Sequence, residues 1–91
     1  MTEPYRRKAV ICNQRGLHAR AAAKFVKLVF EFDAEITVSK HDNAVSGRSI
    51  MGLMMLAAGP GTEIELSGTG KDAEKAVNAL ATLVGAGFDE T

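Results

Sequence analysis

Polar and apolar side chains alternate strictly in two segments of the chain, 35–40 (EITVSK) and 62–67 (TEIELS). Alternation with a period of two predicts strands that are buried on one face only. The side chains expected to point toward the core are Ile36, Val38, Ile64 and Leu66. Segment 8–12 (KAVIC) is short and β-branched at its centre, which predicts a further strand. Segment 44–46 follows turn-forming residues and predicts a short return strand, paired antiparallel with 35–40.

Two further segments have the spacing of amphipathic helices. Segment 19–30 (ARAAAKFVKLVF) is rich in alanine, and its charged positions form a stripe opposite an apolar side. The stripe comprises Arg20, Lys24, Lys27 and Glu31, and the apolar side comprises Ala22, Phe25, Val26 and Val29. Ser49 precedes the apolar run 50–56 and is expected to cap a helix of about two turns. The Gly-Pro-Gly run at 59–61 ends that helix.

A last helix is expected over 73–84, with Asp72 as its N-cap. Gly85 and Gly87 weaken its end, so we expect the final residues to fray. The resulting order of elements is β-α-β-β-α-β-α. Few strands and three one-sided helices predict an α+β fold, with a four-stranded antiparallel sheet and the helices on one face. Neither repeats nor linkers are evident, so residues 1–91 are expected to form a single domain.

Composition and charge narrow the class of protein. The 91 residues include 11 Lys+Arg and 11 Asp+Glu, and 46% are apolar but only 5% aromatic. The apolar share is too high for a disordered chain, and a neutral balance with few aromatic residues disfavours binding to nucleic acid. No segment approaches the ~20 apolar residues of a membrane span, and the N-terminus shows no export signal. Cys12, the single cysteine, cannot form an internal disulfide, so we expect a cytoplasmic protein without membrane insertion.

The candidate functional site is the run GLHAR at 16–20, where a loop leads into the first predicted helix. The first turn of a helix has unpaired backbone N–H groups and a partial positive charge, which favour an anion and disfavour an imidazolium. We therefore expect His18 to stay neutral and nucleophilic, exposed at the mouth of the helix, and to accept a phosphoryl group. Arg20 would bind the same oxygens, and Gly16 allows the backbone to aim the imidazole outward. Taken alone, a histidine in this position is more often an ordinary loop residue.

Two runs resemble the signatures of one known family. GLHARAAAKFVKLV resembles the active-site signature of HPr, the histidine-containing phosphocarrier of the bacterial phosphoenolpyruvate-dependent phosphotransferase system. SGRSIMGLMMLAAGPGTEIEL resembles the family's second signature, around its regulatory serine. The distance between the two runs and the order of elements also agree with the family, so the resemblance covers nearly the whole chain. It implies an HPr-like domain with the fold of an open-faced β-sandwich.

The resemblance implies roles for three residues. His18 matches the histidine that phospho-Enzyme I phosphorylates on Nδ1 and that an EIIA-type acceptor dephosphorylates. Arg20 matches the arginine that steadies the phosphoryl group. Ser49 matches the serine that HPr kinase/phosphorylase modifies in organisms that have this regulator. The chain is thus expected to be a monomeric carrier and a substrate of these enzymes, not an enzyme, and to need no cofactor or metal.

Together with the resemblance, the helix faces predict a docking surface. Lys24 and Lys27 lie in the basic stripe that starts near His18, and the second helix has more apolar side chains than two turns can bury. These side chains are Ile50, Met51, Met54 and Met55. Methionines flanked by cations suit a surface that several acidic partners contact in turn, namely Enzyme I, an EIIA-type acceptor, HPr kinase/phosphorylase and other regulated proteins. Without the resemblance, the methionines would be interpreted as core and the lysines as solvated charges.

Two positions depart from the family's pattern. Ala21 stands where the family usually has proline, and Arg15 where it often has a small polar residue. Proline suits an early helical position, so we expect a looser first turn and an altered lifetime or transfer rate of the phosphohistidine. The departure leaves open a regulatory binding protein of a nitrogen-type phosphotransferase branch, whose phosphorylation state controls a partner. A small-ligand-binding domain without phosphotransfer is a third alternative, but nothing in the composition indicates a pocket for it.

Three other features are weak candidates. Segment 68–71 (GTGK) lacks both the first glycine and the final Ser/Thr of a phosphate-binding loop. His41 has no second histidine or cysteine near it in sequence, which makes a metal site improbable. Cys12 has no base beside it and is interpreted as a small residue of the first strand.

Overall fold

The elements follow the predicted order in the computed structural model, which describes residues 3–90. Within these residues there are four strands, three α-helices and a short 3-10 turn. They are β1 (Tyr5–Val10), α1 (Ala19–Val29), β2 (Glu35–Lys40), β3 (Asn43–Ser46), α2 (Ile50–Met55), β4 (Glu63–Thr69), α3 (Ala73–Gly85) and η1 (Gly87–Asp89). None of the helices in the described part of the chain combines the length and the apolar composition needed to cross a membrane.

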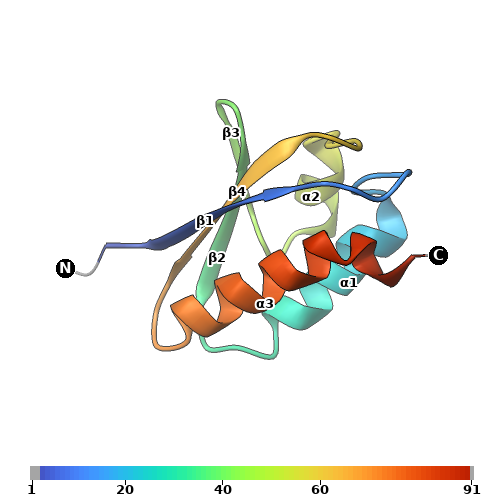
Figure 1. The fold of residues 1–91 in the computed structure, drawn as a ribbon. Helices are drawn as coiled ribbons and strands as arrows, with labels where there is room; N and C mark the ends of the chain where they lie inside the picture. Colours follow the sequence, from blue (N-terminus) through green and yellow to red (C-terminus); the bar gives the residue numbers. More distant parts are fainter. Residues whose placement is uncertain (1–2, 91) are drawn as a thin grey trace.

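The strands form one antiparallel sheet in the order β1-β4-β2-β3. The predicted hairpin between β2 and β3 is present, and its register pairs Val38 with Val45. Figure 1 shows α1 and α3 side by side across one face of the sheet, and α2 packs against α1. The predicted α+β architecture, an open four-stranded sheet with three helices, is confirmed.

The core lies between the sheet and the helices. The four inward side chains predicted from strand alternation are all buried, as is the predicted apolar side of α1. Phe25, at the centre of that side, is completely buried, which stabilises the folded chain by about 1.5–3 kcal/mol relative to an exposed ring. Burial of this one face fixes the rotation of α1, so the start of the helix is held in place against the sheet.

The bounds of the first strand differ from the prediction. The strand begins at Tyr5 and ends at Val10, so the predicted segment 8–12 was wrong at both ends. β1 is an edge strand that pairs only with β4, and much of it faces solvent. The first half of the strand is mostly charged, and Arg6, for example, forms an ion pair with Glu65 at 3.3 Å. This half therefore has no run of apolar residues that would mark it as a strand. Apolar patterning therefore placed the strand too late in the sequence.

Asp72 occupies the N-cap position of α3, but its side chain does not cap the helix. Its carboxylate Oδ2 instead accepts a hydrogen bond from the backbone N–H of Asp33 at 2.9 Å, while Asp72 N–H donates to the carbonyl of Asp33. The predicted side-chain cap was therefore wrong. The carboxylate joins the turn before β2 to the turn before α3, a pairing between segments that are distant in sequence.

Residues 86–90 do not fray, contrary to the prediction, while residue 91 lies outside the described part of the chain. After α3, the turn η1 brings Phe88 back into the core, where its side chain is fully buried. Gly87, Phe88 and Asp89 all have positive φ, at 65°, 56° and 60°. A left-handed conformation is unfavourable for residues with a side chain, and the burial of the Phe88 ring offsets that cost. The last described residues therefore have a defined path that leads to α1.

Candidate functional site

The loop between β1 and α1 is fixed by hydrogen bonds at both of its ends. Asn13 is buried, and its Nδ2 donates to the carbonyl of Gly16 at 2.8 Å, while Gly16 N–H donates to the carbonyl of Asn13. Leu17 N–H then donates to the carbonyl of Ala58 at 3.0 Å. Gly16 has φ +64°, and a Cβ there would lie 2.2 Å from the Ala58 oxygen. Only glycine fits this turn.

His18 is the N-cap residue of α1. Its carbonyl accepts the first hydrogen bond of the helix, from Ala22 N–H at 2.9 Å, but its side chain makes no capping bond. The imidazole therefore lies at the end of the helix where backbone N–H groups have no intrahelical acceptor. The ring is less exposed than expected, with 14% of the side chain accessible to solvent. The expectation of an openly exposed ring was wrong because a carboxylate from the end of the chain covers one side of it.

That carboxylate belongs to Glu90, which contacts two residues of the site through its two oxygens. Oε1 accepts a hydrogen bond from Asn13 Nδ2 at 2.9 Å, and Oε2 contacts His18 Nε2 directly. The hydrogen bond from Asn13, then that from His18, and the charges of His18 and Arg15 lower the pKa of Glu90, against the opposing effect of burial. An ionised carboxylate accepts hydrogen bonds only, so the proton of this contact is assigned to Nε2 of His18.

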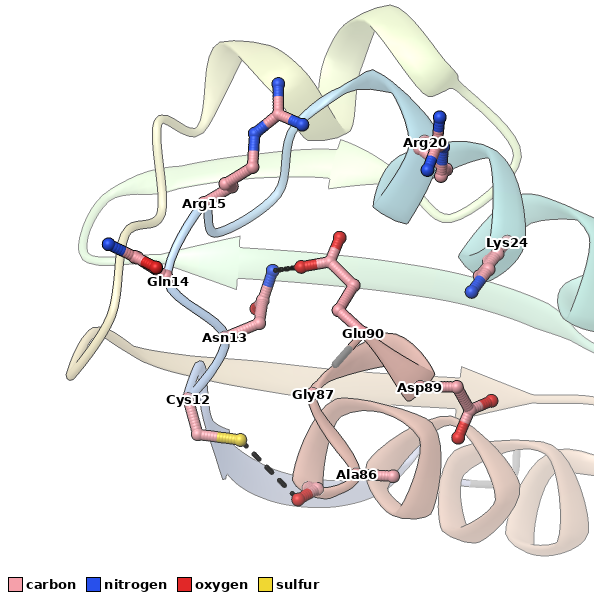
Figure 2. Close-up of a pocket in the computed structure, with 11 residues that line it drawn as sticks. Cys12, Asn13, Gln14, Arg15, Arg20, Lys24, Ala86, Gly87, Asp89 and Glu90 are labelled. Carbon is pink, nitrogen blue, oxygen red and sulfur yellow. Dashed lines mark hydrogen bonds between the residues drawn. The ribbon is translucent and has the colours of Figure 1, made fainter.

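Cations surround the carboxylate. Figure 2 shows Glu90 between the loop that carries Asn13 and Arg15 and the helix that carries Arg20 and Lys24. These residues line a hollow of about 660 Å³, together with residues at the end of α3. Arg20 is exposed, and no ion pair within residues 3–90 involves it. Its guanidinium is therefore available to an anion that approaches the start of α1.

A second hollow joins His18 to α2. It is lined by the imidazole, by Arg15 and by Met54, together with residues 57–59. Met51 and Met55 of α2 are 69% and 78% exposed, whereas Ile50 and Met54 are half exposed. The structure thus brings the predicted nucleophile and the predicted apolar patch onto adjoining parts of one surface.

The two lysines predicted for docking differ in their surroundings. Lys27 is exposed to solvent, at the end of α1 that lies away from His18. Lys24 is half-buried, and its Nζ donates a hydrogen bond to the carbonyl of Phe88 at 2.7 Å. Lys24 therefore holds the end of the chain against α1, a role that the sequence did not indicate.

Ser49 caps α2 as predicted. Its Oγ accepts a hydrogen bond from the backbone N–H of Gly52 at 2.9 Å, and its carbonyl accepts one from Leu53 N–H. Leu53 is the one fully buried side chain of this short helix, so the cap and this anchor fix α2 together. A hydroxyl at this position lies beside Ile50 and Met51 and directly before the exposed apolar patch.

The weak candidates of the sequence remain outside the site. Cys12 follows β1 instead of lying in it, so its interpretation as a strand residue was wrong. Its thiol is exposed and lies 3.4 Å from the carbonyl oxygen of Val84, which ties the loop to the end of α3. His41 is an exposed turn residue between β2 and β3. Across residues 3–90, no cluster of three His, Cys, Asp or Glu side chains is placed to hold a metal ion.

Sequence reasoning missed two members of the site, Asn13 and Glu90. The sequence analysis assigned Asn13 no role and placed Glu90 among the final residues that were expected to fray. One signal for the second was Phe88, because an aromatic ring so soon after the helix-ending glycines is seldom left in solvent. An expectation that Phe88 is buried would have indicated that the residues around it are ordered. It would not have indicated that Glu90 lies against His18.

Comparison with known proteins finds one family model and several relatives that are similar to this chain. A family model described as "PTS HPr component phosphorylation site" matches residues 5–86. The phosphocarrier protein NPr of Shewanella violacea is 50% identical over 84 residues, which cover 92% of each protein. The phosphocarrier protein HPr of Neisseria meningitidis is also 50% identical, over 80 residues, 88% of this chain and 90% of that protein. The crystal structure of HPr from Thermoanaerobacter tengcongensis matches with a TM-score of 0.90 and 39% identity, covering 96% of this chain and 98% of that one.

Proposed function

This chain belongs to the HPr family of phosphocarriers, and we propose that His18 is the residue that carries the phosphoryl group. In this proposal, Nδ1 of His18 accepts the group from phospho-Enzyme I and passes it to an EIIA-type acceptor. The exchange takes place in the cytoplasm, a reducing compartment that suits a chain whose single cysteine, Cys12, has no partner for an internal disulfide.

The position of His18 at the start of α1 is the observation that carries the proposal. A phosphoryl group on this ring would lie near the unpaired N–H groups of the first helical turn, which stabilise an anion. Ala21 lies in this turn and is fully buried. Unlike the family's usual proline, alanine keeps its own N–H, so the turn has an additional donor while it loses the rigidity of the proline ring.

Arg20 supplies the charge that the phosphoryl group requires. Its exposed guanidinium lies two residues after His18 and can donate two hydrogen bonds to phosphoryl oxygens. Arg15 lines the same two hollows as the site residues and adds a second cation. The arrangement offers a nucleophile and an anion site, which suits a carrier. We therefore assign the alignment of donor and acceptor to the partner enzymes.

The docking surface that we propose extends from the second hollow over α2 to Lys27 in the last turn of α1. It comprises Ile50, Met51, Met54 and Met55 with Lys27, and Lys24 contributes less because its ammonium is bonded to the end of the chain. Exposed methionines adapt to different partners, and nearby cations favour acidic ones. Because Met54 and His18 line one hollow, a partner bound to the methionines would reach the imidazole.

We propose Ser49 as a regulatory site for an HPr kinase/phosphorylase where the organism has one. A phosphoryl group there would place about two negative charges at the start of α2. The helix would tolerate them, but they would lie beside Met51 and oppose the approach of an acidic partner. Regulation would therefore act on docking without unfolding the protein.

The relatives do not favour the regulatory alternative over the carrier function. NPr of Shewanella violacea and HPr of Neisseria meningitidis are equally similar to this chain, and both are named phosphocarrier proteins. The function that both names share is the transfer of a phosphoryl group. A nitrogen-type regulatory branch would differ in the partners and would use the same His18 chemistry.

Phosphorylation by Enzyme I tests the proposal. The purified chain, a His18→Ala variant and a His41→Ala control are each incubated with phosphoenolpyruvate and Enzyme I. The two histidines are the only ones in the sequence, so the control removes an exposed imidazole outside the site. Acid-labile, base-stable phosphate is expected on the wild type and on His41→Ala, and not on His18→Ala. Label on all three proteins, or on none, would contradict the proposal.

A further inference from the structure

A buried side chain and backbone hydrogen bonds fix the last described residues, which lead to His18. Phe88 is anchored in the core, Lys24 binds its carbonyl at 2.7 Å, and the Glu90 N–H donates to the carbonyl of Gly87 at 3.1 Å. The match to the family model covers residues 5–86, and Phe88 and Glu90 follow it. A buried ring and two hydrogen bonds for so few residues indicate a fixed position for the carboxylate that follows.

The Glu90 carboxylate has one partner on each oxygen. Asn13, which is itself held in the site loop by its bond to Gly16, fixes Oε1, and Oε2 contacts Nε2 of His18. A carboxylate that is held in place and accepts a ring N–H determines which nitrogen carries the proton, and it restricts rotation of the ring. The remaining nitrogen, Nδ1, then has its lone pair available.

We infer that Glu90 is a positioning residue for His18: its carboxylate holds the Nε2 proton and leaves Nδ1 as the nitrogen that receives the phosphoryl group. The inference rests on the proposed function and specifies how this chain selects the reactive nitrogen. The lowered pKa of Glu90 supports it, since the carboxylate is then ionised at neutral pH.

The charge balance of the transfer agrees with this role. The Nδ1 lone pair forms the new N–P bond, while the N–P bond of the phosphohistidine on Enzyme I breaks and its electron pair stays on the donor nitrogen. The Nε2 proton is retained, so the ring of His18 becomes positively charged, and the negative charge of Glu90 lies directly against it. The carboxylate therefore stabilises the phosphorylated ring more than the free one.

A blocking role for the carboxylate fits the structure less well. Glu90 lines the first hollow, whereas His18 lines the second, together with Met54 of the proposed docking surface. A partner that approaches over α2 would reach the ring from the second hollow without displacing Glu90. Arg15, Arg20 and Lys24 line the first hollow and offset the negative charge of the carboxylate there.

Three variants separate positioning from a general effect of charge. Glu90→Ala removes both the acceptor and the charge, Glu90→Gln keeps an acceptor oxygen, and Asp89→Asn removes a charge from the neighbouring residue. Figure 2 shows that the side chains of Asp89 and Glu90 point in opposite directions, which makes Asp89→Asn a matched control. Folding of each variant is checked by the amide NMR spectrum of the sheet.

The first readout uses the unphosphorylated protein and the ¹⁵N chemical shifts of the His18 ring at a pH where the ring is neutral. In the wild type and in Asp89→Asn, we expect shifts typical of a protonated Nε2 and an unprotonated Nδ1. In Glu90→Ala the two shifts should move toward each other as the tautomers mix, and Glu90→Gln should lie between. Unchanged shifts in Glu90→Ala, or an equal change in Asp89→Asn, would overturn the inference.

The second readout is the rate of phosphorylation by phospho-Enzyme I. We expect Glu90→Ala to be about 10- to 100-fold slower, the range found when a group that orients a histidine is removed, and Asp89→Asn to match the wild type. Faster transfer in Glu90→Ala would show that the carboxylate blocks the site and would overturn the inference. A wild type that accepts no phosphate would contradict the proposed function instead, and the ring shifts would still test the role of Glu90.

Discussion

Lys24 on α1 and Phe88 near the end of the chain are joined by a hydrogen bond of 2.7 Å from the ammonium group to the backbone carbonyl. The bond connects the helix that begins at His18 to the turn that delivers Glu90 to the same histidine. The helix α1 and the last described residues therefore form one unit, although 64 positions separate the two bonded residues. The stability of that unit and the chemistry of His18 can be tested separately.

Replacing Phe88 by alanine should destabilise the protein. The ring is fully buried, and removal of a buried phenylalanine side chain lowers the free energy of unfolding by about 3–5 kcal/mol. Phe30, which is 64% exposed, provides the matched control, and Phe30→Ala should change the free energy by less than about 1 kcal/mol. Urea denaturation measures both, and equal effects of the two substitutions would show that Phe88 does not anchor the end of the chain.

Removal of the Ser49 cap should weaken α2. Ser49→Ala deletes the acceptor of the Gly52 N–H bond, at an expected cost of about 1 kcal/mol in the free energy of unfolding. Ser49→Asp keeps an acceptor at the cap, so it should retain stability but bind Enzyme I more weakly, since its charge lies beside the methionines. Equal stability of Ser49→Ala and the wild type would contradict the capping role. Undiminished binding by Ser49→Asp would contradict the proposed regulation.

The turn before α1 should accept only glycine at position 16. In Gly16→Ala the new Cβ would meet the Ala58 oxygen at 2.2 Å in a left-handed conformation, so the loop must move. Gly61 also has positive φ but open space around it, so Gly61→Ala should cost only the backbone strain of about 1–2 kcal/mol. Thermal unfolding should therefore show a clearly larger loss for Gly16→Ala, and a similar loss for both would contradict the steric role of Gly16.

The docking surface can be tested by charge reversal and by substitution of an exposed methionine. Lys27→Glu and Met51→Glu should each weaken the binding of Enzyme I, because the first repels an acidic partner and the second places a charge in the apolar contact. Lys71→Glu is the control, since Lys71 is an exposed residue between β4 and α3. Titration calorimetry provides the affinities, and equal affinities for Lys27→Glu, Met51→Glu and Lys71→Glu would exclude this surface.

Acid should remove the contribution of Glu90 to stability. The pKa of Glu90 in the folded protein is lowered from 4.5, first by the hydrogen bond from Asn13 and then by that from His18, with the charge of Arg15 also contributing. A carboxyl group of this kind stabilises the folded chain above its unfolded pKa, and the stabilisation is lost as the pH falls through the folded pKa. The difference in unfolding free energy between the wild type and Glu90→Gln should thus shrink as the pH falls below 4.5. A difference that persists unchanged to pH 3 would contradict this contribution.

Local sequence patterns predicted the elements that bury one regular face. Strict alternation identified β2 and the inward side chains of β4, and the helical spacing identified the buried side of α1. The hydroxyl of Ser49 was correctly assigned as a cap because its partner, Gly52 N–H, is only three residues away.

Contacts between distant segments could not be predicted in the same way. Asp72 has the residue type of a helix cap, but its carboxylate binds Asp33 N–H, 39 positions away. The glycines after α3 indicated a frayed end, whereas the burial of Phe88 depends on a gap in the core that no local pattern describes. The contact between Glu90 and His18 follows from that burial, so the sequence indicated His18 as the candidate nucleophile but not the carboxylate that contacts it.

The position of the phosphoryl group on the ring tests the central claim most directly. After phosphorylation by Enzyme I and phosphoenolpyruvate, two-dimensional NMR that correlates ³¹P and ¹⁵N identifies the nitrogen bonded to phosphorus. A single phosphorus coupled to Nδ1 of His18 is the predicted result, because Nε2 is engaged by Glu90. Coupling to Nε2, or a phosphoryl group on any residue other than His18, would contradict the account.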